Sequence, residues 1–221
     1  EVNNTDKITD YVGECRRMGI AILPPDVNQS GLKFQPEVRP GEKASQCRAI
    51  RYGMSAVKNV GEGAVRAIVA EREANGPFKS LEDFTMRLDT STVSRKVIES
   101  LVRSGAFDWT GQWRWDLFGR IELAMAGASS AQKDKKSGQE SLFDSMFFTT
   151  PAANPSTVAE ADPWPKDKLL ADEKELLGFF VSGHPLDSYK QAFAKGMYRA
   201  LGNLGALDAV RRGGNDRRRQ P

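Results

Sequence analysis

The stretch AVKNVGEGAVRAIVAERE, from Ala56 to Glu73, decides how this chain folds. It begins with an apolar approach, passes through a tight turn that carries Gly61 and Gly63, and ends in residues whose apolar side chains recur at helical spacing. The pattern predicts a helix, a glycine turn and a second helix. Glycine tolerates positive φ and allows close approach of another group. We therefore expect the N–H groups of Gly63, Ala64 and Val65 to face an anion at the start of the second helix.

The turn also resembles the helix-hairpin-helix motif, which grips the sugar-phosphate backbone of nucleic acids without reading base sequence. Lys58 precedes the turn and Arg66 follows it, so both cations are placed for charge-assisted contacts with one phosphate track. The alternative is a plain connection between two packed helices, because closely spaced glycines suit any tight turn. The predicted DNA-binding residues are Lys58, Gly61, Gly63, Ala64 and Arg66.

The residues around the turn favour DNA contact over a plain connection. IRYGMSAVKNVGEGAVRAIVAER, from Ile50 to Arg72, is similar to the corresponding segment of the alpha subunits of bacterial DNA polymerase III, the family C replicative polymerases. Two further blocks are also similar to this family, YVGECRRMGIAILPPDVNQSGLKF from Tyr11 to Phe34 and LLADEKELLGFFVSGHPLDSY from Leu169 to Tyr189. The resemblance runs in the family's order from Tyr11 to Tyr189, so it implies a fragment of that subunit.

A second short motif, Gln139 to Phe143, lies in a polar stretch. An extended peptide of this kind buries two adjacent apolar side chains, while its glutamine amide sets the register by hydrogen bonding to backbone groups. The motif resembles the pentapeptide by which bacterial polymerases dock onto the sliding clamp, although Asp144 departs from the small residue often found next. The alternative is a loop anchor that folds back onto the helical unit. The predicted clamp-binding residues are Gln139, Ser141, Leu142 and Phe143.

The remaining pattern predicts a mainly α fold. Ser80 with Asp83 three residues on resembles a capping box, and Gly19 suits the end of a first helix. Short extended runs at Leu32–Phe34 and Ala49–Tyr52 predict a small β-hairpin. The expected helices span Thr5–Met18, Ser80–Leu88, Val93–Phe107, Trp113–Met125, Lys168–Val181 and Met197–Val210. We expect 97–125 to form a second, degenerate helix-hairpin-helix that turns at Ser104–Ala106 and serves mostly as scaffold.

These elements divide the chain into six expected segments. The stretch 127–167 is rich in small, polar and proline residues that bury little apolar surface, so it is predicted to be a flexible linker. The segments are 1–19, the end of a helical fingers region; 20–52, a connector with the β-hairpin; 53–126, the tandem helix-hairpin-helix unit; 127–167, the linker with the clamp-binding peptide; 168–210, a helical segment; and 211–221, a basic tail leading toward an OB domain.

Composition limits the other functional classes. The net charge of +3 permits nucleic-acid binding, but several arginines crowd the last eleven positions and are typical of a solvated end. Cys15 and Cys47 lie far apart without a metal-binding pattern, which favours free thiols in a reducing, cytoplasmic setting. No long apolar run predicts a membrane span. His184, the only histidine, precedes a proline in a turn and is expected to be structural.

The resemblance implies a function for the fragment. It would bind duplex DNA non-specifically and tether a DNA-directed DNA polymerase, a nucleotidyltransferase, to the sliding clamp, the beta subunit, during DNA replication. The whole polymerase would use two Mg²⁺ ions, but no catalytic or metal-binding residue is assigned to this chain and no cofactor is expected here. The expected partners are duplex DNA, the clamp and other polymerase III holoenzyme subunits. The alternatives are an error-prone paralogue of the family or a purely structural helical interaction module.

Overall fold

A computed structural model of the chain describes residues 5–38, 49–137 and 163–189. The chain divides into two compact units, 1–182 and 183–221. In the second unit, the described residues form a short 3₁₀ helix, η5 (Pro185–Tyr189). The backbone N–H of Leu186 donates to His184 Nδ1 at 3.2 Å, which is a hydrogen bond of the kind expected for His184. The expected helix Met197–Val210 and the basic tail lie outside the described residues.

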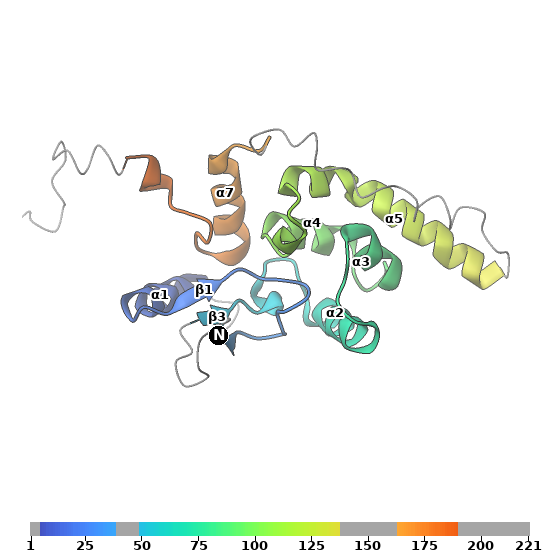
Figure 1. The fold of residues 1–221 in the computed structure, drawn as a ribbon, viewed down its shortest axis with the longest axis horizontal. Coiled ribbons are helices and arrows are strands. Elements are labelled where there is room, and N and C mark those ends of the chain that lie inside the picture. Colours follow the sequence, from blue (N-terminus) through green and yellow to red (C-terminus); the bar gives the residue numbers. More distant parts are fainter. Residues whose placement is uncertain (1–4, 39–48, 138–162, 190–221) are drawn as a thin grey trace, which may run out of the picture. The chain divides into compact units, whose positions relative to one another are not determined.

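The first unit is mainly helical with one small sheet, which confirms the predicted fold class (Figure 1). Among its described residues the elements, in order, are α1 (Thr5–Arg17), β1 (Ala21–Leu23), β2 (Gln35–Glu37), β3 (Ala49–Arg51), the 3₁₀ helix η2 (Met54–Ala56), α2 (Glu62–Asn75), α3 (Leu81–Arg87), α4 (Arg95–Arg103), the 3₁₀ helix η3 (Asp108–Thr110), α5 (Arg114–Ser137) and α7 (Lys166–Leu177).

The sheet has one more strand than the predicted hairpin. Its strand order is β1-β3-β2, with β2 antiparallel and β1 parallel to the central strand. The hairpin partner of β3 is Gln35–Glu37 rather than Leu32–Phe34, because Phe34 instead packs edge-on against Tyr52 with ring centroids 4.6 Å apart. The guanidinium of Arg51 donates to the Glu37 carboxylate at 2.5 and 2.6 Å and so links β3 to β2.

Several helix boundaries follow the predicted capping signals. Gly19 has φ of 73° just after α1, and the Asp83 N–H donates to Ser80 Oγ at 3.1 Å at the start of α3. The helix predicted over Val93–Phe107 is shorter, because Gly105 adopts φ of 87° two residues after Arg103. The helix predicted to end at Met125 instead continues to Ser137. The expected linker is therefore wrong over its first residues, where Ala and Lys favour a helix.

The core of the first unit lies where α3 and α4 pack against α5. Phe78, Phe84 and Phe107 stack edge to face in a chain, with ring centroids 4.9 and 5.1 Å apart. Such aromatic pairs add about 0.5–1.5 kcal/mol each beyond the burial of their surface. Val65 and Ile68 of α2 are completely buried in the same core, so the helix that follows the glycine turn has a fixed position.

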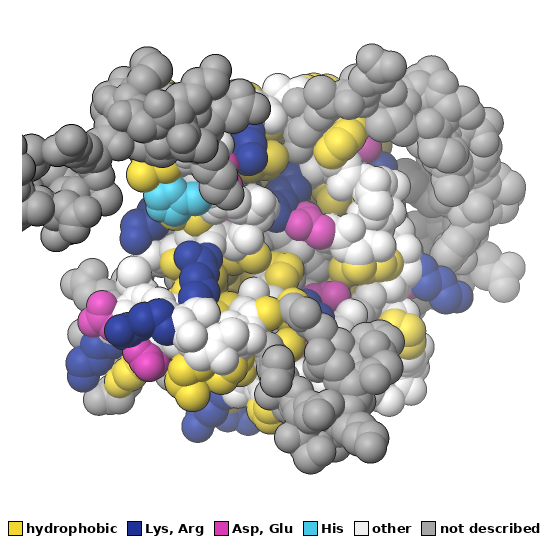
Figure 2. Space-filling model, turned by 60° about the vertical axis from the view of Figure 1, so that its left-hand side comes forward, with side chains coloured by type: hydrophobic (Ala, Val, Ile, Leu, Met, Phe, Trp, Pro, Cys, Tyr) yellow, Lys and Arg dark blue, Asp and Glu magenta, His cyan; other side chains and the backbone are white. Residues whose placement is uncertain are grey.

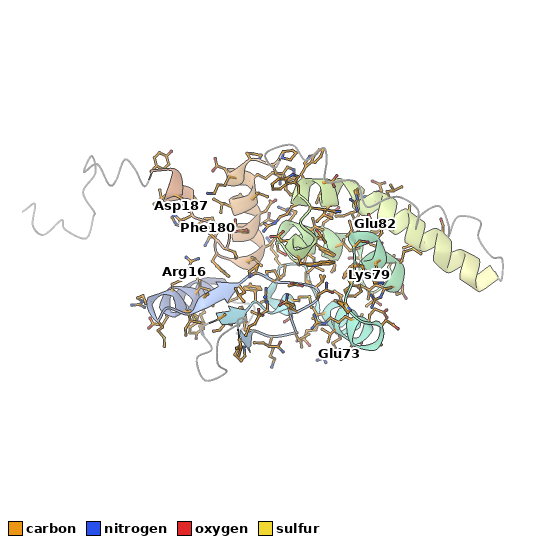
Figure 3. The ribbon with its side chains drawn as sticks, in the orientation of Figure 1. Arg16, Glu73, Lys79, Glu82, Phe180 and Asp187 are labelled. Atoms are coloured by element: carbon orange, nitrogen blue, oxygen red, sulfur yellow. The ribbon has the colours of Figure 1, made fainter. Side chains whose placement is uncertain are left out.

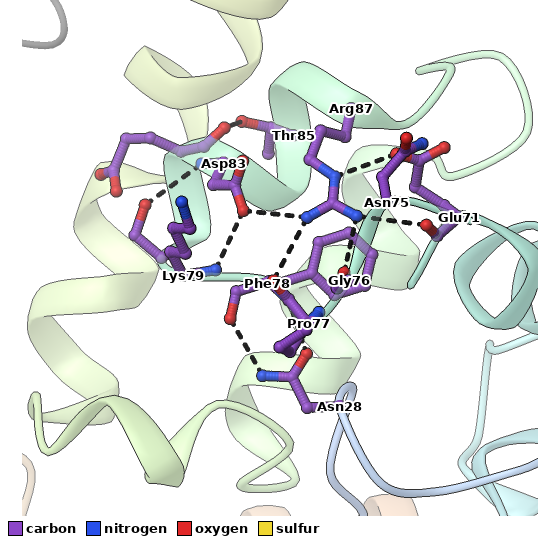
Figure 4. Close-up of polar contacts among 12 residues, drawn as sticks. Asn28, Glu71, Asn75, Gly76, Pro77, Phe78, Lys79, Asp83, Thr85 and Arg87 are labelled. Carbon is purple, nitrogen blue, oxygen red and sulfur yellow. Dashed lines mark hydrogen bonds and ion pairs between the residues drawn. The ribbon is translucent and has the colours of Figure 1, made fainter. Parts of the chain in front are cut away.

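Arg87 ties the end of α2 to α3 (Figure 4). Its guanidinium donates to Glu71 Oε1 at 2.9 Å, to Asp83 Oδ2 at 3.2 Å and to the Gly76 carbonyl at 2.8 Å, and it lies 4.5 Å from the centre of the Phe78 ring. Donation from Arg87 is the main cause that lowers the pKa of the Glu71 carboxyl. The positive charge of Arg87 therefore stabilises the packing of α3 against the end of α2.

Helix α7 docks back onto elements from the start of the chain. It was predicted over Lys168–Val181 but ends at Leu177, because Gly178 adopts the left-handed conformation. The carbonyls that follow it are bound from α1: Thr9 Oγ1 donates to Gly178 O at 3.1 Å, and the Arg16 guanidinium donates to Phe180 O at 2.7 Å (Figure 3). These contacts bring α7 beside the segment that leads into the glycine turn.

Candidate nucleic-acid interface

The predicted glycine turn lies between η2 and α2. The element before the turn is a single 3₁₀ turn, Met54–Ala56, rather than the expected α-helix. Gly61 caps α2 with φ of −77° and ψ of 155°, and Gly63 lies within the first turn of that helix without a positive φ. The expectation that these glycines supply positive φ is therefore wrong. Asn59 has the positive φ instead, 68°, and its amide donates to Ser100 Oγ of α4 at 3.2 Å.

The start of α2 leaves backbone donors without intrahelical acceptors, with one correction to the predicted set. Helix geometry leaves the N–H groups of Glu62, Gly63 and Ala64 without an intrahelical acceptor, and Gly61 has no side chain to cap them. The Val65 N–H, in contrast, donates to the Gly61 carbonyl at 3.2 Å, so it is not available to a ligand. Ala64 as a whole is buried, whereas Glu62 and Gly63 are exposed, so the accessible backbone at this helix start is that of Glu62 and Gly63.

Open space surrounds both glycines of this turn. Gly61 and Gly63 are exposed, and a Cβ built on either residue would meet no atom of the described chain within 4 Å. Neither backbone conformation requires glycine, so neither packing nor φ explains why glycine stands there. Glycine is itself a common N-cap residue, which suits Gly61, and the missing side chains leave room for close approach of another group.

The two predicted cations are exposed, and both have carboxylate partners. Lys58 Nζ lies 3.7 Å from Glu175 Oε1 of α7, and Arg66 Nη2 lies 3.4 Å from Glu62 Oε2 one turn earlier in α2. Ion pairs at such exposed positions contribute only about 0–1 kcal/mol, so an incoming phosphate can replace either carboxylate. Figure 2 shows the described Lys and Arg side chains of one face spread among apolar and acidic ones rather than gathered in one patch.

An open groove of about 520 Å³ runs beside the turn. Residues 55–61 form one side of it, and residues 175–178 at the end of α7 form another. The Lys58 backbone N–H links these two sides of the groove, because it donates to the Leu176 carbonyl at 2.9 Å. The sequence contained a signal that α7 is amphipathic, but no signal that its end lies against the turn.

The space beside the second predicted turn, around Gly105, is filled by side chains of the same chain. The Arg114 guanidinium donates to Asp108 at 2.6 and 2.9 Å and to Glu173 Oε1 of α7 at 3.1 Å. A Cβ at Gly105 would lie 2.8 Å from Asp108 Oδ2 and would overlap the guanidinium. The space that a phosphate would need is therefore filled by an internal ion pair, which agrees with a scaffold role.

The other sequence-based candidates give the following results. Residues Gln139 to Phe143 lie outside the described part of the chain, as does Cys47, while Cys15 is a free thiol. Across residues 5–38, 49–137 and 163–189, no cluster of three or more His, Cys, Asp or Glu side chains is arranged to hold a metal ion. In that same part, every helix is too short or too polar to cross a membrane.

The chain is similar in sequence to known proteins. A helix-hairpin-helix motif family matches residues 19–117. The chain is 41% identical over 189 residues to the DNA polymerase III subunit alpha of Thermus aquaticus, 38% identical over 192 residues to that of Borreliella burgdorferi and 38% identical over 189 residues to that of Escherichia coli K12. These matches cover 86–87% of this chain but only 14–16% of each relative's length.

Proposed function

The chain belongs, over the segment that it spans, to the DNA polymerase III alpha subunit family, and we propose that this segment holds duplex DNA by its backbone and tethers the polymerase to the sliding clamp. The observation that carries the first half is the open helix start at Gly61 and Gly63, where backbone N–H groups lack intrahelical acceptors and no described atom lies within 4 Å of a Cβ added to either glycine. Contacts of this kind reach phosphate oxygens and ignore base identity.

The electrostatics of the turn support a localised phosphate site. The N–H groups of Gly63 and Ala64 carry the positive end of the α2 dipole, and Lys58 and Arg66 flank them. Since the proposed site consists of two cations and a few backbone donors, affinity depends on a few contacts. We expect duplex binding that weakens steeply with salt and is the same for unrelated base sequences.

The test of DNA contact is duplex binding by fluorescence anisotropy with Gly63→Asp. A carboxylate in the first turn of α2 suits the helix dipole, so the fold is kept, but it repels phosphate and occupies the open space. We expect a loss of affinity of roughly tenfold or more, the size of one or two charge-assisted hydrogen bonds. Gly119→Asp is the matched control, because Gly119 is also an exposed helical glycine with open space around it, on α5. Equal affinity in parent and Gly63→Asp would identify a purely structural hairpin.

The second half of the proposal concerns Gln139 to Phe143. The support is the pattern itself, a glutamine followed by adjacent Leu142 and Phe143, in the connection between α5 and α7. Burial of one Leu and one Phe yields roughly 3–6 kcal/mol before ordering costs. A contact of about micromolar affinity follows, which suits a tether that must hold and release.

Binding of the chain to a bacterial sliding clamp tests the tether. Leu142→Ala/Phe143→Ala should abolish the binding signal. Phe147→Ala/Phe148→Ala, which removes two aromatic side chains just beyond the pentapeptide, should keep it. Equal loss in both double variants would indicate general apolar adhesion instead of a docking peptide. A parent chain that fails to bind the clamp would refute the tether and leave duplex contact as the role of the segment.

The role of the whole protein follows from the same proposal. It would be a DNA-directed DNA polymerase of the cytoplasm that works with the clamp and the other holoenzyme subunits. Its two Mg²⁺ ions would supply nucleotidyl-transfer chemistry outside this segment. The described residues here do not fit a metal centre, and no catalytic step is assigned to them.

A further inference from the structure

The end of α7 lies against the turn that we propose as the phosphate site. The Lys58 N–H donates to Leu176 O at 2.9 Å, and residues 175–178 line the same groove as residues 58–61. The buried Tyr52 hydroxyl lies 3.0 Å from the Leu177 carbonyl and further anchors this end. Any DNA backbone that enters the groove therefore meets α7 as well as the glycine turn.

Glu175 is the acidic side chain of α7 that lines this groove. Its Oε1 lies 3.7 Å from Lys58 Nζ, and its Oε2 accepts from Arg103 Nη2 at 2.8 Å. Lys58 is 59% exposed and Glu175 is 47% exposed, so both side chains are accessible from solvent. Arg103 is itself bound to Asp172 Oδ1 at 2.5 Å, which holds the guanidinium in place beneath Glu175.

The two cations of the turn differ in where their partners come from. Arg66 pairs with Glu62 of its own helix, so this pair moves as one body with α2. Lys58 pairs with a carboxylate of α7, a helix that lies more than a hundred residues later in the sequence. Donation from Arg103 is the main cause that lowers the pKa of the Glu175 carboxyl, so Glu175 carries its negative charge at neutral pH.

We propose that Glu175 is a positioning residue that occupies the Lys58 ammonium when DNA is absent and that a duplex phosphate must displace to use this lysine. The proposal rests on the proposed duplex contact. The Arg103 contact keeps the Glu175 carboxylate in the groove beside Lys58, so the lysine stays paired until phosphate arrives. Docking of α7 thereby lowers the affinity of the turn for DNA and makes the contact easier to release.

A double-mutant cycle on the full 221-residue chain tests this inference, with duplex affinity measured by anisotropy at several salt concentrations. Glu175→Gln should tighten duplex binding by about two- to fivefold, the range expected for an exposed ion pair. The slope of log affinity against log salt should steepen by up to about one, because the interface then carries one more net positive charge and its binding releases about one more cation from the DNA. Lys58→Ala should weaken binding, and Glu175→Gln should have little effect in that background.

Glu122→Gln is the matched control. Glu122 on α5 is 80% exposed and pairs with Arg95 at 3.6 Å, so the variant removes the same charge away from the groove. Retained melting temperature in Glu175→Gln is expected, because Arg103 keeps Asp172 as its partner. This readout separates a change in the site from a change in the fold.

The possible outcomes distinguish a failure of the Glu175 role from a failure of the proposed duplex contact on which it rests. Weaker duplex binding by Lys58→Ala would support duplex contact. The positioning role would still be overturned if Glu175→Gln changed duplex affinity no more than Glu122→Gln does. It would also be overturned if Glu175→Gln changed the affinity equally with and without Lys58. Weaker binding by Glu175→Gln would also overturn the role, since Glu175 would then present Lys58 to DNA. Unchanged binding in both Lys58→Ala and Gly63→Asp overturns the proposed duplex contact, and the inference with it.

Discussion

Gly61 and Gly63 stand at a helix start with open space around them, whereas Gly105 stands under the guanidinium of Arg114. The first turn uses backbone conformations that any residue could adopt, and the second has φ of 87° together with a contact that excludes even a methyl group. Glycine at position 105 is thus required by the fold, while the glycines of the first turn leave open space that a ligand could enter. Four predictions test this difference.

The largest loss of stability is expected from Glu173, the buried carboxylate that pairs with Arg114 beside the second turn. Glu173 is 0% exposed, accepts from Arg114 and also accepts from the backbone N–H groups of Val181 and Ser182 at 2.8 and 3.0 Å. Glu173→Ala should lower the free energy of unfolding by about 3–5 kcal/mol, because it leaves buried donors and part of a buried charge unpaired. Urea denaturation measures this, and a loss below about 1 kcal/mol would contradict the closed turn.

The next effect comes from Gly105 itself. Gly105→Ala should cost about 2–3 kcal/mol, because it combines a disfavoured φ with displacement of the Arg114 and Asp108 pair. Gly111→Ala is the control, since Gly111 has φ of 71° but no neighbour within 4 Å of an added Cβ. The control should lose only about 1–2 kcal/mol. Equal losses in the two variants would mean that the ion pair moves aside freely.

A smaller effect concerns acid sensitivity where α7 docks. Burial alone would raise the pKa of the Asp172 carboxyl, but Arg103 and Lys168 together lower it below its usual value. A lowered folded-state pKa stabilises the fold above the unfolded value, near 4, and this stabilisation is lost as the pH falls further. Asp172→Asn should therefore cost about 1–2 kcal/mol near pH 7, and the difference from the parent should shrink below about pH 4. A difference that is constant with pH would contradict the ionic role.

The smallest stability change separates the two turns most sharply. Gly63→Ala should leave stability unchanged or raise it by about 0.5–1 kcal/mol, because alanine is the better helix former and nothing crowds its Cβ. Duplex binding should nevertheless weaken, since the methyl group occupies the space of the approaching phosphate. Thermal melting and anisotropy on one preparation test both halves. Tighter or equal DNA binding would show that the open space has no ligand.

Local signals in the sequence predicted much of the helical framework. Ser80 with Asp83 and the glycine at position 19 identified real helix ends, because caps are short-range features. Strand β1 was missed, since its three residues pair in parallel with β3 across a long connection. Helix α5 was cut short because the small and polar composition after Met125 suggested a linker, although Ala and Lys favour helix.

The candidate site was predicted less completely than the fold. The position of the turn and its flanking cations could be found from spacing alone. The φ values of Gly61 and Gly63 and the internal use of the Val65 N–H could not, because they depend on the exact residue at which α2 begins. Pairing of Lys58 with Glu175 joins residues far apart in the sequence, so no local pattern could have indicated it.

The hydrogen bond from the Lys58 amide to Leu176 has a kinetic consequence. An amide held by another element exchanges its hydrogen for deuterium only when that element moves away or the whole unit opens. Exchange at Lys58 therefore reports how often α7 leaves the turn, while exchange at Val65, whose acceptor is the local Gly61 carbonyl, reports fraying of α2 alone. The exchange rates of these two amides, which lie a few residues apart, thus report the undocking of α7 and the fraying of α2 separately.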